Sequence, residues 1–250
     1  MNTLQKLSTI LLIALMTSMS YAKEPNKILI VLTSHSELGN TGKKTGFWLP
    51  ELTHPYYVLK KAGYSIDIAS PQGGMAPLDV KAWQEDDHYH QVFLKDAELM
   101  AKVIRTIPLS SIKAKDYKAV LYSGGSGPMW DFPNNKDIQR ISKEIYENQG
   151  IVSALCHGSV ALVNIKLSND KLLIEGKKVT GFSNKEEAML GTTKIVPFLL
   201  EDKLKERGAI YHKAKPWQEN IIISDRLITG QNPASATKLA EAIIKVLENK

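Results

Sequence analysis

The sequence predicts an α/β protein whose mostly parallel sheet is covered by helices on both faces. Short apolar runs rich in β-branched residues alternate along the chain with helical stretches, two of which are followed by Gly63 and Gly150. Strands that alternate with helices form parallel sheets, because each helix carries the chain back to the edge where the next strand begins. A chain of 250 residues is long enough for one such domain with a large core.

Four apolar runs are the predicted strands, at residues 27–33, 65–69, 119–122 and 151–155. Three stretches between them are the predicted helices, at residues 56–62, 96–107 and 137–148. Near the C-terminus, residues 221–224 and 227–229 flank a turn and predict a hairpin. Asn232 and Pro233 then supply an N-cap and a first helical residue, and the apolar stripe that follows predicts a final helix packed on the sheet.

Two long stretches, residues 34–50 and 71–95, do not fit this alternation. Loops of that length in a compact domain are more often functional than idle, and ligands bind beyond the carboxyl ends of parallel strands. We therefore expect both near the active site, with residues 71–95 as a small lid. His88 and His90 lie beside two aspartates there, but no third ligand cluster accompanies them. We expect a solvated loop and no metal.

The N-terminus carries a pattern typical of a cleavable secretory signal. A charge at Lys6 precedes an apolar run over residues 10–19, and Ala22 ends a stretch of small residues. The run is shorter than the roughly 20 residues that a membrane span needs. We expect a signal peptide at residues 1–22, a single domain at 23–250, a periplasmic or secreted protein, and no stable membrane insertion after cleavage. The net charge of +6 is scattered, so nucleic-acid binding is not expected.

Cys156 is the only cysteine, so no disulfide forms within the chain. It follows an apolar strand and precedes His157, Gly158 and the apparent first turn of a helix. A sharp strand-to-helix corner lifts its side chain above the sheet, and the helix N-terminus is expected to lower the pKa of the thiol. The alternative is that Cys156 is one more small buried apolar residue. Its place beside a histidine and a glycine favours a nucleophile.

Several residues are candidate partners of this thiol. His157 is a candidate base, provided that the strand ends before it, and Glu186 and Glu187 are candidates to orient its ring. Glu51 begins a helical stretch after the first strand, where it serves either as an acid–base group or as a helix N-terminal charge. The run Gly124-Gly-Ser-Gly127 follows another strand, and its backbone amides could face an oxyanion.

Six segments in order along the chain resemble the ThiJ/PfpI superfamily, and within it the branch of heat-shock chaperone/glyoxalase III-like proteins. They are residues 44–51, 69–79, 124–131, 154–158, 179–187 and 228–235. The resemblance implies a flavodoxin-like three-layer α/β/α sandwich, the fold shared with class I glutamine amidotransferases. It also implies a homodimer, although no interface signature is visible in the sequence.

The resemblance assigns roles to the candidate residues. It implies Cys156 as nucleophile, His157 as its partner, Glu51 as the acid beside the sulfur and Glu187 as the acid that orients the histidine. Gly124, Gly125 and Ser126 are then the predicted oxyanion and substrate-binding residues, with the amides near Gly125 and His157 forming the oxyanion site. Relatives in this branch carry a histidine where this chain has Ser126. Serine cannot replace an imidazole as a base, although it still donates a hydrogen bond.

The implied activity is a glutathione-independent glyoxalase III reaction, also called D-lactate dehydratase. It converts methylglyoxal or a related 2-oxoaldehyde to a 2-hydroxy acid such as lactate, needs no cofactor, and belongs to methylglyoxal detoxification in a stress response. Two alternatives remain open at this stage. One is a cysteine hydrolase of the deglycase or amidase type. The other is a holdase chaperone or redox-stress protein with little catalysis.

Overall fold

The computed structural model describes residues 26–82 and 86–249. The predicted signal peptide at residues 1–22 lies outside these residues. Within the described part of the chain, no helix is both long enough and apolar enough to cross a membrane.

A seven-stranded sheet runs through the centre of the molecule, in the order β3-β2-β1-β4-β5-β9-β8. All neighbouring strands pair in parallel except β8 and β9, which form the predicted antiparallel hairpin. The strands are β1 (Lys27–Val31), β2 (Ser65–Ser70), β3 (Ile107–Pro108), β4 (Ala119–Tyr122), β5 (Ile151–Leu155), β8 (Ile221–Ser224) and β9 (Leu227–Gly230). A separate parallel pair, which the sequence did not reveal, joins β6 (Lys178–Val179) to β7 (Ile210–Tyr211).

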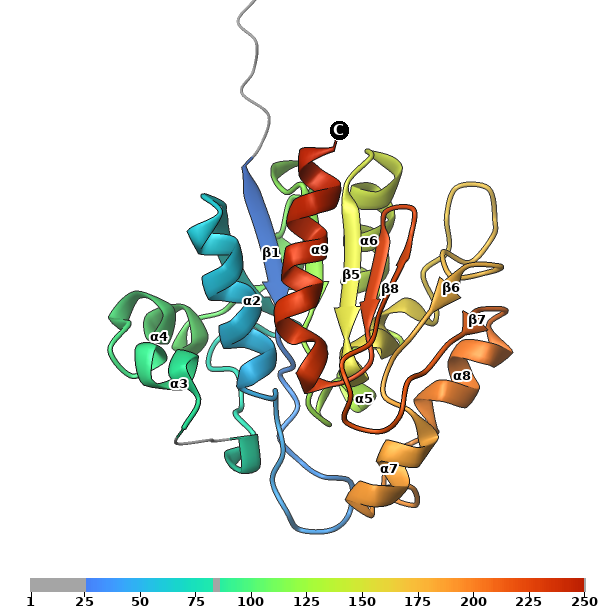
Figure 1. Cartoon of the computed structure of the whole chain (residues 1–250), viewed down its shortest axis with the longest axis horizontal. Coiled ribbons are helices and arrows are strands. Elements are labelled where there is room, and N and C mark those ends of the chain that lie inside the picture. Colours follow the sequence, from blue (N-terminus) through green and yellow to red (C-terminus); the bar gives the residue numbers. More distant parts are fainter. Residues whose placement is uncertain (1–25, 83–85, 250) are drawn as a thin grey trace, which may run out of the picture.

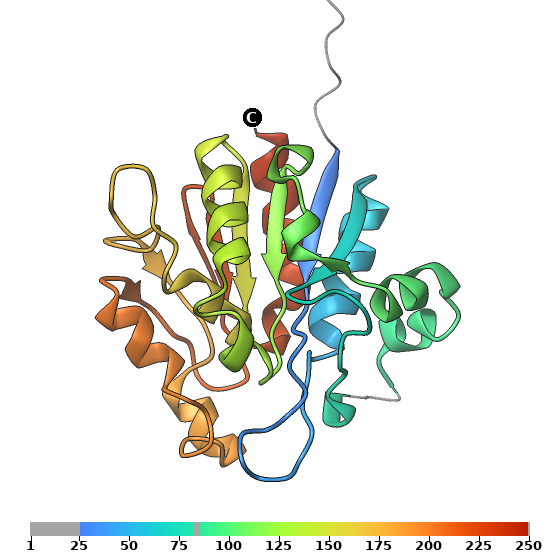
Figure 2. The ribbon, with the colours of Figure 1, turned by 180° about the vertical axis from the view of Figure 1, so that it is seen from behind.

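Helices cover both faces of this sheet and confirm the predicted three-layer class. In Figure 1, α2 and α9 lie in front of the sheet, and the view from behind in Figure 2 shows α6 on the opposite face. The α-helices are α2 (Pro50–Lys61), α3 (His88–Phe93), α4 (Ala97–Ile104), α5 (Pro128–Asp131), α6 (Lys136–Glu147), α7 (Asn184–Leu190), α8 (Leu200–Glu206) and α9 (Ala236–Glu248). Short 3-10 helices are η1 (Val80–Ala82), η2 (Leu109–Ser111), η3 (Ala114–Asp116), η4 (Cys156–Leu162) and η5 (Pro233–Ser235).

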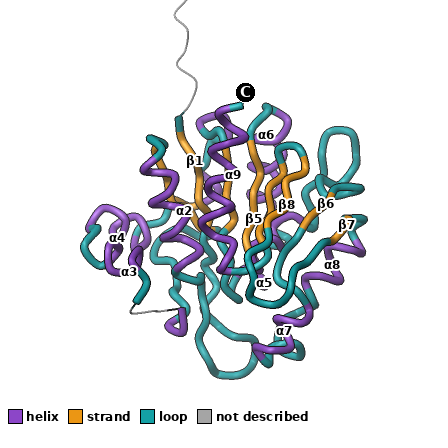
Figure 3. The backbone as a smooth tube through the Cα atoms, in the orientation of Figure 1, coloured by secondary structure: helices purple, strands orange, loops and turns teal. Residues whose placement is uncertain are grey.

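Strand β1 is the centre of the sheet and fixes where a site can form. It pairs with β2 on one side and β4 on the other, and Ile28, Leu29, Ile30 and Val31 are fully buried. The winding of the chain reverses between β1 and β4, so the connections that leave their carboxyl ends diverge and open a crevice. Figure 3 shows loops gathered at this end of the sheet, including the long connection from β1 to α2.

Two helix starts differ from the sequence prediction for a local reason. Helix α2 begins at Pro50 instead of residue 56, because proline is well suited to a first helical position, and the helix also contains Pro55. Pro233 begins the short helix η5, and α9 starts only at Ala236, after this tighter turn. The apolar stripe of the final helix packs as predicted, with Leu239, Ala240 and Ile243 buried.

The prediction of a solvated loop around His88 and His90 is wrong, because both residues lie in helix α3. Asp87 caps helix α3 by accepting hydrogen bonds from the backbone of Tyr89 and His90, and the His90 side chain is buried. The other Asp87 oxygen lies 2.7 Å from Nε2 of His54, which connects this segment to α2. Within residues 26–82 and 86–249, no three histidine, cysteine or acidic side chains are placed to hold a metal ion.

Candidate active site

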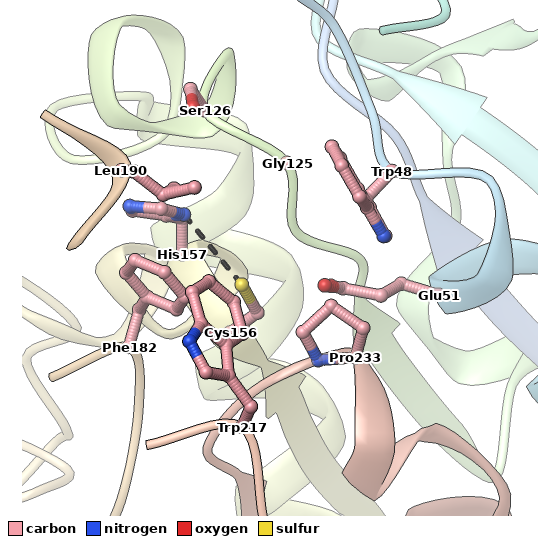
Figure 4. A pocket seen from close by; sticks show the side chains of 10 residues that line it. All are labelled: Trp48, Glu51, Gly125, Ser126, Cys156, His157, Phe182, Leu190, Trp217 and Pro233. Atoms are coloured by element: carbon pink, nitrogen blue, oxygen red, sulfur yellow. Dashed lines mark hydrogen bonds between the residues drawn. The ribbon is translucent and has the colours of Figure 1, made fainter. Parts of the chain in front are cut away.

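Cys156 sits at the predicted corner between a strand and a helix. Strand β5 ends at Leu155, and Cys156 begins η4 with φ 57°, a left-handed conformation that costs a non-glycine residue about 1–3 kcal/mol. The corner presses against β4, because a Cβ on Gly158 would lie 2.3 Å from the Tyr122 carbonyl oxygen. The strained turn aims the sulfur into a pocket beyond the sheet (Figure 4).

The imidazole of His157 faces the sulfur on one side of this pocket. Its Nδ1 lies 3.6 Å from Sγ of Cys156, and its Nε2 lies 2.8 Å from Oε2 of Glu187. Burial acts to raise the pKa of Glu187, but the hydrogen bonds and charge of His157, together with the Thr192 hydroxyl, bring the pKa below its ordinary value. An ionised Glu187 accepts a hydrogen bond from Nε2–H of His157, which leaves Nδ1 unprotonated and able to take a proton from the thiol.

Glu51 approaches the sulfur from the other side. It lies in the first turn of α2, fully buried, and its Oε2 accepts a hydrogen bond of 2.8 Å from the amide of Gly124. Its Oε1 has no hydrogen-bond partner among residues 26–82 and 86–249. Burial raises the pKa of Glu51 to about 8, so the carboxyl group exchanges a proton near neutral pH.

The prediction that a helix N-terminus lowers the pKa of Cys156 is wrong. Burial raises the pKa of this thiol well above its ordinary value, and the charge of the neighbouring Glu51 raises it further. A single backbone contact from His157 acts in the opposite direction. Helix η4 is a short 3-10 helix, whose dipole is too small to offset these two effects. The thiol therefore needs a base when it attacks.

The glycine-rich run after β4 has two roles: one glycine binds Glu51, and the next two residues line the pocket. The amide of Gly124 holds Glu51, and a Cβ at this position would lie 2.4 Å from Oε2 of Glu51 and 2.8 Å from Cβ of Cys156. Gly125 and Ser126 line the pocket beside the sulfur. Gly125 has φ 97°, and a Cβ there would lie 2.3 Å from the Gly46 carbonyl oxygen, so only glycine fits. The Gly125 amide stays the predicted oxyanion donor.

The remaining pocket walls are apolar side chains that sequence reasoning did not select as site residues. They are Trp48, Phe182, Leu190, Trp217 and Pro233. Trp48 and Phe182 lie in two of the segments that carry the family resemblance, residues 44–51 and 179–187, so the sequence did point to them. Trp217 lies between β7 and β8 in a stretch with no periodic pattern, and only its spatial position reveals its role.

Glu186 shapes this apolar wall without facing the sulfur. Its Oε1 accepts hydrogen bonds from the Trp217 amide at 2.9 Å and the Asn232 side chain at 2.8 Å. Its Oε2 accepts from the amide and hydroxyl of Ser183 and from the Gln231 side chain. These bonds hold Trp217 at φ 63° on the rim of the pocket. Both acids named from the sequence are thus buried here, but only Glu187 contacts His157.

Comparisons with known proteins agree with this fold. The DJ-1/PfpI family profile matches residues 44–246. The chain is 33% identical to glyoxalase 3 of Candida albicans, over 89% of this chain and 98% of that protein. It is also 33% identical to a glutathione-independent glyoxalase of Saccharomyces cerevisiae, over 90% of this chain and 99% of that protein.

Solved structures give the same result. The 24-kDa rapid encystment protein of Francisella tularensis superposes with a TM-score of 0.86 at 44% identity, covering 88% of this chain and 98% of that one. Glyoxalase III of Candida albicans superposes with a TM-score of 0.83 at 33% identity, covering 88% of this chain and 96% of that one. From its profile, its relatives and its fold, this chain belongs to the DJ-1/PfpI family.

Proposed function

We propose that this protein is a glutathione-independent glyoxalase that converts methylglyoxal or a related 2-oxoaldehyde to a 2-hydroxy acid. One observation carries the proposal: Sγ of Cys156 lies between Nδ1 of His157 at 3.6 Å and a buried Glu51 carboxyl group with one unpartnered oxygen. A nucleophile with a separate acid–base group on each side suits a reaction that must move two protons. The relatives named as glyoxalase 3 and as a glutathione-independent glyoxalase support it.

The first step is addition of the thiol to the aldehyde carbon, C1. Sγ of Cys156 forms a bond to C1 while the thiol proton passes to Nδ1 of His157, which Glu187 orients through Nε2. The aldehyde oxygen takes up the electron pair of the broken π bond, and the amides of Gly125 and His157, two residues that line the pocket, are its predicted donors. His157 then returns the proton to this oxygen, which gives a hemithioacetal.

The second step is a proton shift between the two carbon atoms. Glu51, when ionised, takes the hydrogen of C1 as a proton, and the electron pair moves toward C2 to give an enediolate. Glu51 then returns the proton to C2, the hydroxyl proton of C1 passes to the oxygen of C2, and the product is a thioester of the 2-hydroxy acid. Water cleaves the thioester, releasing the acid and the Cys156 thiol. Because the hydrogen moves within the substrate, no external oxidant or reductant takes part.

Lactate formation from methylglyoxal tests the proposal. We expect the purified protein, without glutathione, to release lactate, and Cys156→Ala to release none above the uncatalysed rate. Asp225→Asn, in the turn between β8 and β9 and far from the pocket in the fold, is the matched control and should match the wild type. Equal turnover by the wild type and Cys156→Ala would contradict the proposal.

We also propose that residues 1–22 direct export, on the sequence pattern alone. Expression of the full chain in a bacterial host, followed by mass analysis of the purified protein, tests this. A mature N-terminus at Lys23 is expected, and a chain that keeps residues 1–22 would contradict it.

A further inference from the structure

Two buried polar atoms on the Glu51 side of the pocket have no partner. They are Oε1 of Glu51 and Nε1 of Trp48, neither of which has a hydrogen-bond partner within residues 26–82 and 86–249. Buried donors and acceptors are nearly always paired, because leaving one without a partner costs about 1–3 kcal/mol. An unpaired acceptor and an unpaired donor from neighbouring pocket residues therefore suggest a ligand that bonds to both.

The position of Trp48 is fixed by its backbone. Its amide donates to the Gly124 carbonyl oxygen at 3.1 Å, and its own carbonyl oxygen accepts from the Glu51 amide at 3.0 Å. On either side, Phe47 and Leu49 are buried in the core. A Cβ on Gly125 would lie 2.7 Å from the Trp48 nitrogen, so the two segments are in close contact. The indole is thus held against the strip of backbone that carries the predicted oxyanion donor.

The indole nitrogen of Trp48 points to the space beside Glu51, where a second oxygen of the substrate would lie. Figure 4 shows the nitrogen edge of Trp48 turned toward the Glu51 carboxyl group, on the opposite side of the Cys156 sulfur from His157. A 2-oxoaldehyde bound to the sulfur through C1 has its aldehyde oxygen at the amides of Gly125 and His157. Its ketone oxygen, on C2, then lies toward Glu51 and Trp48.

We infer that the indole N–H of Trp48 donates a hydrogen bond to the ketone oxygen of the substrate. This inference rests on the proposed function and adds a catalytic residue to it. When Glu51 removes the proton from C1, the electron pair moves toward C2 and negative charge grows on this oxygen. Indole is a donor with no acceptor function, so it stabilises the charged oxygen and cannot compete with Glu51 for the proton. The bond is strongest in the enediolate, and its loss lowers kcat more than it raises KM.

The substitution Trp48→Phe tests the inference, because it keeps an aromatic wall and removes only the N–H group and part of the ring. We expect kcat for methylglyoxal to fall roughly 100-fold, as when a single oxyanion donor is removed, with KM changed by less than about threefold. Trp130→Phe is the matched control: Trp130 stacks on His35, outside the pocket lining, and turnover should be unchanged. Thermal unfolding of both variants checks the fold.

Propanal provides a second measurement that does not depend on turnover. It forms a hemithioacetal with the same thiol but has no ketone oxygen, so its inhibition constant should be the same in the wild type and in Trp48→Phe. A folded Trp48→Phe with wild-type kcat would overturn the inference, and so would an equal loss in kcat and in propanal binding. If the wild type itself releases no lactate, the proposed function fails, which is a separate result.

Discussion

The two sides of Cys156 are built differently, although each presents a buried acid. On one side the Glu51 carboxyl group interacts with only the Gly124 amide and the Cys156 thiol, and its Oε1 has no hydrogen-bond partner among the described residues. On the other side Glu186 accepts five hydrogen bonds, and both oxygens of Glu187 are occupied by His157 and Thr192. A carboxylate saturated with donors is held as a fixed anion, whereas one left unsatisfied in a buried site readily takes up a proton. We conclude that Glu51 itself takes up and releases a proton, whereas Glu187 and Glu186 act as fixed acceptors that hold His157 and Trp217 in place.

The largest effect is expected from Glu51→Gln. Glutamine keeps the acceptor for the Gly124 amide but cannot carry a proton, so turnover of methylglyoxal should fall about 1,000-fold. The thiol itself should not become less reactive, because the substitution removes a charge that raises the pKa of Cys156. We expect iodoacetamide to modify Cys156 at pH 7 at least as fast as in the wild type. Parallel losses in turnover and alkylation would mean that Glu51 acts only on the thiol.

A smaller effect is expected from Glu187→Gln on the opposite side. The amide weakens the hold on Nε2 of His157 and no longer stabilises a protonated ring, so turnover should fall about 100-fold. In this variant kcat/KM should still rise with pH around the same midpoint as in the wild type, because the ionisation of Glu51 sets that rising limb. A shift of that limb would show that the two sides do not act separately.

The two sides should also differ in stability: Glu186→Gln should lower the free energy of unfolding and Glu51→Gln should raise it. In Glu186→Gln the new amide N–H₂ meets groups that are themselves donors, and urea unfolding should show a loss of about 1–3 kcal/mol. Glu51→Gln should instead increase the free energy of unfolding above pH 5. The pKa of Glu51 is about 8 in the fold against an ordinary 4.5, so the folded protein keeps a proton that the unfolded chain releases. The free energy of unfolding therefore falls as the pH rises from 4.5 to 8.

Glutamine does not titrate, so the advantage of Glu51→Gln over the wild type should grow across this pH range. If both glutamine variants destabilise the protein equally at pH 8, the contrast between the two acids is wrong.

The sequence predicted the sheet well because its strands are buried on both faces. The run 151–155 is apolar except for Ser153 and became β5 with the same bounds, and the corner at Cys156 followed from the histidine and glycine after it. Strands β3, β6 and β7 and helices α3, α5, α7 and α8 were missed, since two-residue strands and one- to two-turn helices carry too little periodicity to detect.

The site was only partly accessible to sequence reasoning. Glu51 lies more than 100 residues before Cys156, and only the family resemblance favoured a role beside the sulfur over that of a helix N-terminal charge. Trp217 lies on the pocket rim because the side chain of Glu186 binds its backbone, a contact that no local pattern encodes. The direction of the thiol pKa was wrong because it depends on burial and on Glu51, which are properties of the folded chain.

The pH dependence of kcat/KM for methylglyoxal tests the central claim, that Glu51 takes the proton of C1 and must be ionised to do so. Burial raises the pKa of Glu51 to about 8, so the ionised form gains population as the pH rises through 8. We predict that wild-type kcat/KM rises with pH, reaches half its maximum near pH 8 and levels off above it, and that Glu51→Gln has no such limb. A wild-type profile that is flat between pH 6 and 9, or a limb near pH 8 that survives in Glu51→Gln, would contradict the account.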